Sequence, residues 1–418
     1  MATVIGGGTT TFLNAGSQDT NGVAASLTSI LNTALANGSL NRTAPNTNPT
    51  VGAGLAVIST PGVYVALAPA VTSFLVTSGG GTDTVIGSGG PKQAGLIDNT
   101  NTTFFTGGGS GTVVAGDGND FIGTPTTGGG GFLIQVGNGN DVITAASGNN
   151  TITAGTGSDI IGSGTPGGFS NNIISVQGSG FIIGAGLGTD TIYGGPGPEI
   201  ISEGTKSFVF VGSTGSATVV ASSGSDTINV GTGGGLFVGG SAGNNFIASG
   251  TGVAGTTIFG GGNNDLLVSR GTANNTLVAG SGNETLTGGT TGSVAGGNTT
   301  FFTASGNASV LAGIGADTIF SGAGNSTVSM STVSGSGKDL LAIVNGRAGG
   351  TVLINNFAAK AGNAVTLLGF AAPTGFGSEA AKDIAGQTAT AAGATITLSD
   401  GTKVIFAGVA SVNNSNFI

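Results

Sequence analysis

The chain contains no cysteine and no tryptophan, and its 418 residues include no histidine. Without histidine or cysteine, Ser-His-Asp and Cys-His catalysis are excluded, and the usual zinc ligands are missing. Disulfide bonds are excluded too, and the absence of cysteine is compatible with any redox compartment. These absences leave oxygen atoms as the donors that a metal site could use.

Charge is also scarce, since only 6% of the residues are charged, where about 25% is typical. Nine basic residues stand against eighteen acidic ones, which gives a net charge of -9. A nucleic-acid partner needs a basic surface, so none is expected here. Hard cations, which prefer oxygen ligands, remain compatible with this balance.

Long apolar runs are missing as well. No segment approaches the roughly eighteen uninterrupted apolar residues of a membrane-spanning helix, so no transmembrane insertion is expected. The first nineteen residues lack the basic start and apolar core of a secretory signal peptide. Prolines number only 10, and no strict G-X-Y period predicts collagen.

What the chain has in abundance is glycine, with 87 residues, about a fifth of the total, against a usual level of roughly 7%. High glycine with low charge is also found in disordered chains. Hydrophobic residues nevertheless make up 38% of the sequence, and they recur at regular places. This regularity favours a folded repeat protein.

One short phrase recurs along the chain: a glycine turn, an Asp or Asn, and an aliphatic residue two positions later. The repeat position is held by Asp83, Asp120, Asp141, Asn150, Asp159, Asp190, Glu199, Asp226, Asn245, Asp265, Glu284, Ala308, Asp317, Ser326 and Asp339. The residue two positions later is always aliphatic: Val85, Ile122, Ile143, Ile152, Ile161, Ile192, Ile201, Ile228, Ile247, Leu267, Leu286, Val310, Ile319, Val328 and Leu341.

The spacing of these positions predicts an all-β fold. Steps of 19 or 20 residues separate Asp226, Asn245 and Asp265, and steps of nine occur elsewhere, as from Asp141 to Asn150. A coil of two short strands and two glycine turns explains both values. Stacked coils bury their aliphatic side chains and pair strand upon strand. We therefore expect a parallel β-solenoid over residues 76–345.

The two ends depart from the repeat. Residues 1–75 are expected to form a small cap or assembly domain, with an amphipathic helix at Val23–Gly38. Residues 346–418 are expected to form a β-rich cap. Within it, Ala394–Val409 alternates apolar and polar residues around Asp400 and Gly401, which predicts a β-hairpin.

Several of these phrases resemble a known repeat. They are AGDGNDFIG (Ala115–Gly123), VGNGNDVIT (Val136–Thr144), AGTGSDIIG (Ala154–Gly162) and AGLGTDTIY (Ala185–Tyr193). They are similar to G-G-x-G-x-D-x-U-x, the nonapeptide of RTX, or haemolysin-type calcium-binding, proteins. The resemblance covers roughly Gly79–Leu341 and implies a parallel β-roll that binds Ca²⁺ between successive turns on the same side. It also implies type I secretion by a signal in the C-terminal region, and hence a secreted, extracellular or cell-surface protein.

Asp carboxylates and backbone carbonyls would be the calcium ligands that the resemblance implies. The candidate metal ligands are Asp83, Asp117, Asp120, Asp141, Asp159, Asp190, Asp226, Asp265, Asp317 and Asp339. Stacked carboxylates repel one another unless a cation neutralises them. Asp141 with Asp159 is the best pair, and Asp117 with Asp120 is a second candidate. Because Asn, Glu, Ala or Ser often replaces Asp, fewer ions than turns are expected. The alternative is that these side chains only accept hydrogen bonds from turn amides.

For function, the sequence favours a structural protein over an enzyme, because no cluster of carboxylates with basic residues suggests a catalytic groove. The expected role is a self-assembling surface layer, extracellular filament or biofilm matrix, in which calcium drives folding and assembly. The alternative is an adhesin, or a module that binds ice or a cell-surface polysaccharide. A T-x-T triplet at Thr151–Thr153 is the motif that raises this alternative.

Overall fold

The structure of the protein is a computed structural model. It describes residues 2–6, 9–13, 41–43, 54–58, 61–62, 64–67, 71–76, 81–87, 92–125, 129–164, 170–184, 188–204, 207–252, 254–262, 264–289, 297–333, 337–347, 349–359 and 362–418. The helix predicted at Val23–Gly38 lies outside these residues.

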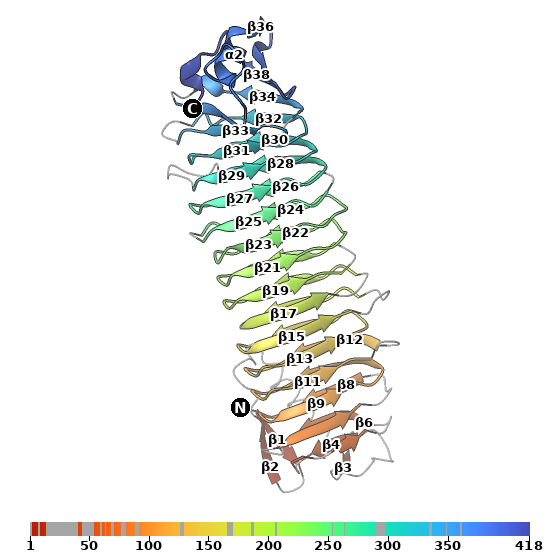
Figure 1. Ribbon diagram of the computed structural model, residues 1–418. Coiled ribbons are helices and arrows are strands. Elements are labelled where there is room, and N and C mark those ends of the chain that lie inside the picture. Colours follow the sequence, from red (N-terminus) through yellow and green to blue (C-terminus); the bar gives the residue numbers. More distant parts are fainter. Residues whose placement is uncertain are drawn as a thin grey trace. The chain divides into compact units, whose positions relative to one another are not determined.

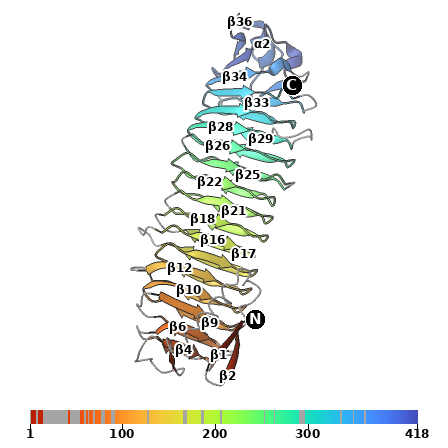
Figure 2. The same cartoon turned by 180° about the vertical axis from the view of Figure 1, so that it is seen from behind.

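The fold is an all-β parallel solenoid, as the spacing of the repeat predicted. It comprises two compact units, Met1–Val209 and Phe210–Ile418. In both units the strands lie in successive layers, which Figures 1 and 2 show from opposite sides. Each coil gives one strand to an odd-numbered sheet and one to an even-numbered sheet.

In the Met1–Val209 unit, parallel pairing joins each strand to the one two positions further along the chain. The odd-numbered sheet contains β5 (Tyr64–Ala66), β7 (Thr82–Ile86), β9 (Asn101–Phe105), β11 (Phe121–Gly123), β13 (Val142–Ala145), β15 (Ser158–Ser163), β17 (Ser179–Gly184) and β19 (Glu199–Ser202). The even-numbered sheet contains β4 (Gly54–Ile58), β6 (Val71–Val76), β8 (Lys92–Leu96), β10 (Gly109–Val114), β12 (Gly129–Gln135), β14 (Thr151–Ala154), β16 (Ile173–Val176) and β18 (Thr191–Tyr193), with β3 (Asn41–Thr43) beside β4. A separate antiparallel pair joins β1 (Ala2–Gly6) and β2 (Thr9–Leu13).

The Phe210–Ile418 unit repeats this pairing. Its odd-numbered sheet contains β21 (Ala217–Val220), β23 (Gly235–Val238), β25 (Thr256–Phe259), β27 (Asn275–Val278), β29 (Thr299–Phe302), β31 (Thr318–Ser321), β33 (Leu340–Val344) and β35 (Ala364–Leu368). Its even-numbered sheet contains β22 (Thr227–Asn229), β24 (Phe246–Ala248), β26 (Leu266–Val268), β28 (Asn283–Thr287), β30 (Asn307–Leu311), β32 (Ser326–Ser329) and β34 (Thr351–Asn355). The boundary between the units falls within β20 (Val209–Val211).

Beyond β35 the chain leaves the repeat. The predicted hairpin is present, because β37 (Gly393–Thr397) pairs antiparallel with β38 (Lys403–Ala407). On its other edge β38 pairs parallel with β34, so parallel pairing continues past the boundary expected at residue 345. Shorter elements complete the region: α2 (Glu379–Ala385), β36 (Thr388–Thr390) and η3 (Asn414–Asn416), while η2 (Phe357–Ala359) lies between β34 and β35.

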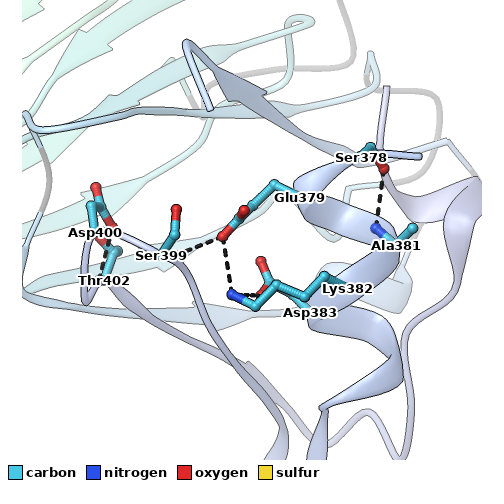
Figure 3. A network of polar contacts seen from close by, with 8 residues as sticks. All are labelled: Ser378, Glu379, Ala381, Lys382, Asp383, Ser399, Asp400 and Thr402. Carbon is cyan, nitrogen blue, oxygen red and sulfur yellow. Dashed lines mark hydrogen bonds and ion pairs between the residues drawn. The ribbon is translucent and has the colours of Figure 1, made fainter. Parts of the chain in front are cut away.

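A polar network holds α2 against the hairpin (Figure 3). The Ser378 hydroxyl caps α2 by accepting the backbone N–H of Ala381. Glu379 Oε1 accepts the backbone N–H of Ser399 at 2.6 Å and pairs with Lys382 Nζ at 3.3 Å. This helix was not predicted, since seven residues give too short a periodic pattern to recognise.

The core is built on the aliphatic residues of the repeat, with buried phenylalanines among them. Every one predicted to point inward is at most 1% exposed. In the odd-numbered sheet Ile122, Ile143 and Ile161 lie in register, one per coil. The inward residue of a strand is aliphatic in most layers and phenylalanine in others, as at Phe104, Phe237 and Phe301, and together these residues form a buried stack in each unit. Among the described helices, none is both long and apolar enough to span a membrane.

Candidate calcium site

The aspartates at the repeat position point into the molecule rather than into solvent. All nine are buried, with between 0 and 5% of their surface exposed: Asp83, Asp120, Asp141, Asp159, Asp190, Asp226, Asp265, Asp317 and Asp339. Asp117, the only candidate outside the repeat position, is exposed. Burying a carboxylate is costly unless it is neutralised or well hydrogen-bonded, so each of these groups requires a partner.

Three of them, Asp120, Asp141 and Asp159, occupy successive coils at one edge of the odd-numbered sheet in the first unit. The backbone N–H of Thr102 donates to Asp120 Oδ1 at 2.8 Å. That of Asp120 donates to Asp141 Oδ1 at 2.7 Å. The N–H of Asp141 donates to Asp159 Oδ1 at 3.0 Å. One oxygen of each carboxylate thus links its coil to the preceding coil; we call these three residues the acidic column.

The second oxygen of each carboxylate in the acidic column has a different environment. Asp120 Oδ2, Asp141 Oδ2 and Asp159 Oδ2 are buried, and nothing in the described part of the chain donates a hydrogen bond to them. A buried oxygen without a donor is rare and destabilising in a native protein. Three such oxygens in adjacent coils are the environment that a bound cation would complete.

The electrostatics of the acidic column agree with this. The pKa of Asp120 is raised to about 8, chiefly by burial, with smaller contributions from the charges of Asp141 and Asp98 and against the opposing hydrogen bond from Thr102. Burial likewise raises the pKa of Asp141 to about 7, with a contribution from the Asp159 charge. Burial also raises the pKa of Asp159 to about 6. Without a cation, the acidic column therefore disfavours the ionised form of its three carboxyl groups.

The glycine turns beside the column bring backbone carbonyls close to it. A Cβ atom added to Gly139 would lie 1.7 Å from the carbonyl oxygen of Gly118. One added to Gly157 would lie 1.5 Å from the carbonyl oxygen of Gly139. Only glycine allows the turns to stack this closely. Among the described residues no group of three acidic side chains is placed to hold a metal ion, so an ion between two carboxylates would need further oxygen ligands, for which the turn carbonyls are the candidates.

Carboxylate and carbonyl oxygens together form the donor set that Ca²⁺ prefers. Adjacent carboxylates of the column, Asp120 with Asp141 or Asp141 with Asp159, would hold an ion together with the turn carbonyls, and the ion would neutralise their buried charges. The residues of the acidic column therefore fit calcium.

Asp117 lies in a separate ladder on the exposed side of the same turns. Its Oδ1 accepts the backbone N–H of Asn138 at 3.0 Å, and its own N–H donates to Asn99 Oδ1 at 3.0 Å. The structure therefore does not bring Asp117 into the buried column with Asp120. Asp117 still affects the column through its charge, which raises the pKa of Asp141.

Four other predicted ligands have both carboxylate oxygens hydrogen-bonded. Asp190 Oδ1 accepts the Asn172 N–H at 2.7 Å, and its Oδ2 accepts the Ser163 hydroxyl at 3.0 Å. Asp265, Asp317 and Asp339 each accept two backbone N–H groups, one on each oxygen. At these positions the side chains do what the alternative interpretation expected, which is to satisfy backbone amides.

Sequence reasoning missed some members of these ladders. Asn172, Asn275 and Asn363 are buried and hold equivalent positions, each with a buried aliphatic residue two places later. That aliphatic signal is present in the sequence, but the expected glycine turn before it is less regular. Glu199 was treated as a departure, yet burial raises its pKa to about 7 and its Oε2 has no donor among the described residues.

Comparison with known proteins supports the calcium interpretation for part of the chain. Residues 127–164 and 295–328 match the family described as the RTX calcium-binding nonapeptide repeat, in four copies. The first segment contains Asp141 and Asp159, and the second contains Asp317. No curated protein and no solved structure gives a significant match. The protein thus carries repeats of the RTX calcium-binding nonapeptide family, as the sequence resemblance implied.

Proposed function

We propose that this is a secreted, calcium-binding structural protein that assembles with copies of itself outside the cell, in a surface layer, a filament or a biofilm matrix. The observation that carries this proposal is the acidic column, in which Asp120, Asp141 and Asp159 each bury an oxygen to which no described residue donates. Calcium would supply the missing positive charge, so that ion binding and folding of these coils are coupled.

The calcium dependence gives a reason for assembly outside the cell. Extracellular calcium modules bind at roughly 10⁻⁴–10⁻³ M, well above the free calcium inside cells. The chain would stay incompletely folded before export and fold after it. The RTX repeats and the all-β solenoid suit a structural or adhesive role, and no enzymatic activity is proposed. A second copy of the chain is the proposed partner.

The test is to concentrate the purified full chain with calcium and with a chelator. Electron microscopy and light scattering should show ordered sheets or fibres with calcium and dispersed particles with the chelator. Magnesium at the same concentration is the control for ionic strength. A calcium-loaded protein that stays monomeric at every concentration would overturn the assembly role while leaving calcium binding intact.

A second function, adhesion to ice or a polysaccharide, is favoured by the outer face of the odd-numbered sheet in the Phe210–Ile418 unit. Five threonines lie in one column of this face, interrupted once by Leu236: Thr218, Thr257, Thr276, Thr300 and Thr318. Beside it runs an apolar column in which the rings of Phe302 and Phe320 stack at 4.7 Å.

Such a regular, uncharged face suits an ordered surface. The triplet Thr151–Thr153 does not extend into a column, because Leu133 and Ile173 flank Thr151. Ice-recrystallisation and polysaccharide pull-down assays on Thr257→Lys with Thr300→Lys test this face. Binding that is lost in this variant would support adhesion, and absence of binding by the unmodified chain would exclude it.

A further inference from the structure

The geometry points to a difference among the repeats in calcium binding. Calcium binds at the acidic column. No ion binds at Asp265, Asp317 and Asp339, because backbone N–H groups of the chain already donate to both oxygens of each carboxylate. This inference rests on the calcium-binding role proposed above. It also means that one of the two segments that match the RTX family, residues 295–328, has lost the ion.

The first observation concerns the glycine four residues before each aspartate. In the second unit, the N–H of Gly313 donates to Asp317 Oδ2 at 2.6 Å, and that of Gly261 donates to Asp265 Oδ2 at 2.7 Å. In the acidic column, Gly137 precedes Asp141 by the same distance. Its N–H donates instead to the carbonyl oxygen of Gly116, at 3.0 Å. The glycine N–H thus satisfies the second oxygen of Asp265 and of Asp317, whereas at Asp141 it leaves that oxygen without a donor among the described residues.

Both carboxylate oxygens of Asp339 also accept backbone N–H groups, but the donor to the second oxygen is not the glycine four residues earlier. Its Oδ2 accepts the N–H of Ser331 at 2.9 Å, from a residue eight places earlier in the chain. Its Oδ1 accepts the N–H of Asp317 at 3.3 Å. Hydrogen bonds to both oxygens stabilise the charged carboxylate without a metal. A cation would have to displace these amides in order to reach the oxygens.

The second observation concerns the asparagines that share these ladders. Asn245 Oδ1 accepts the N–H of Asp226 at 3.0 Å, as the column aspartates do with their own neighbours. Its Nδ2 group then donates to the carbonyl oxygen of Gly240 at 2.9 Å. Asn363 Nδ2 likewise donates to the carbonyl oxygen of Phe357 at 3.2 Å. A side-chain NH₂ here bridges to the kind of turn carbonyl that would otherwise ligate calcium.

The even-numbered sheet offers no alternative ligand within the matched segment. Its repeat positions there are Ala308 and Ser326, neither of which carries a carboxylate. Asp317 is therefore the only acidic side chain at a repeat position of residues 295–328, and both of its oxygens already accept hydrogen bonds. This segment keeps the fold of the repeat without its ion.

Hydrogen–deuterium exchange on the unmodified full chain, with calcium and with a chelator, tests the inference directly. Calcium should slow amide exchange in peptides covering 116–160 by at least tenfold and should leave peptides covering 313–342 unchanged. Equal protection of both segments would overturn this difference and would keep the calcium role. No protection and no calcium binding anywhere would overturn the proposed function and this inference with it.

Two matched variants measure the number of bound ions by equilibrium dialysis. Asp141→Asn should reduce the calcium bound per chain. Asp317→Asn should leave that number unchanged, even if it lowers thermal stability equally with and without calcium. Loss of bound calcium in Asp317→Asn would contradict the inference.

Discussion

The backbone N–H of Asp120 donates to Asp141 Oδ1 at 2.7 Å, while Asp141 Oδ2 is buried with no donor among the described residues. One carboxylate therefore has two roles. It joins two coils through its first oxygen, and it presents its second oxygen, without a partner, beside the glycine turns. The first role belongs to the fold, and the second is the basis of the calcium proposal.

Removing both carboxylates of the best pair should weaken the response to calcium. In Asp141→Ala with Asp159→Ala, the column loses two of its three charges and two links between coils. We expect a higher midpoint, by roughly tenfold or more, in a calcium titration followed by circular dichroism. An unchanged titration would remove these residues from the site.

Replacing the same pair by asparagine should have a different effect. Asn150 in the neighbouring sheet accepts the Phe132 N–H and donates its Nδ2 to the carbonyl oxygen of Gly148 at 3.1 Å. Asp141→Asn with Asp159→Asn should therefore fold with little dependence on calcium. Circular dichroism in chelator should show more folded protein than the unmodified chain does. A variant that is unfolded with and without calcium would refute this expectation.

The calcium-free protein should lose stability as the pH rises. Burial raises the pKa values of Asp120, Asp141 and Asp159 to about 8, 7 and 6, from the ordinary aspartate value of 3.8. The folded state therefore binds more protons than the unfolded state between about pH 4 and pH 8. Stability is greatest near pH 4 and falls toward pH 8, by on the order of a few kcal/mol.

Urea unfolding at pH 4.5, 6 and 8 measures this slope. Saturating calcium should flatten it, because the ion replaces the protons on the column. A chelated protein that becomes more stable as the pH rises would contradict the raised pKa values.

The sequence alone predicted the fold because the core signal is local. Ile122, Ile143 and Ile161 each follow a repeat position by two residues, and each is fully buried. The buried aspartates were also found from their spacing. The sequence could not predict that the acidic column differs from Asp265 and Asp317 in its hydrogen bonds. The difference depends on whether the N–H of the glycine four residues earlier points to the carboxylate. That direction follows from the stacking of turns some twenty residues apart, which one coil's sequence does not contain.

Core packing should matter equally with and without calcium. Ile143 is 0% exposed and lies between Ile122 and Ile161, so Ile143→Ala should cost about 2–5 kcal/mol. The control is Thr144→Ala on the exposed side of the same strand, which should change stability by less than about 0.5 kcal/mol. Thermal unfolding of both variants, in calcium and in chelator, checks this pair. Equal losses in the two would argue against the buried stack.

The effect of adding a side chain at a glycine should depend on how closely that glycine approaches the neighbouring coil. Gly139→Ala would place a Cβ atom 1.7 Å from the carbonyl oxygen of Gly118, so it should destabilise the protein by about 1–3 kcal/mol or more. At Gly162 a Cβ atom would meet only the carbonyl oxygen of Ile143, at 3.9 Å. Gly162→Ala should therefore be tolerated. Similar melting temperatures for the two variants would show that the turns are not packed this closely.

Anomalous diffraction from crystals grown with calcium, at a wavelength where the ion scatters anomalously, would locate the bound ion itself. We expect an anomalous peak about 2.3–2.6 Å from Asp141 Oδ2, within the acidic column, and no peak beside Asp317. A column with only water, or no density, next to Asp141 Oδ2 would contradict it.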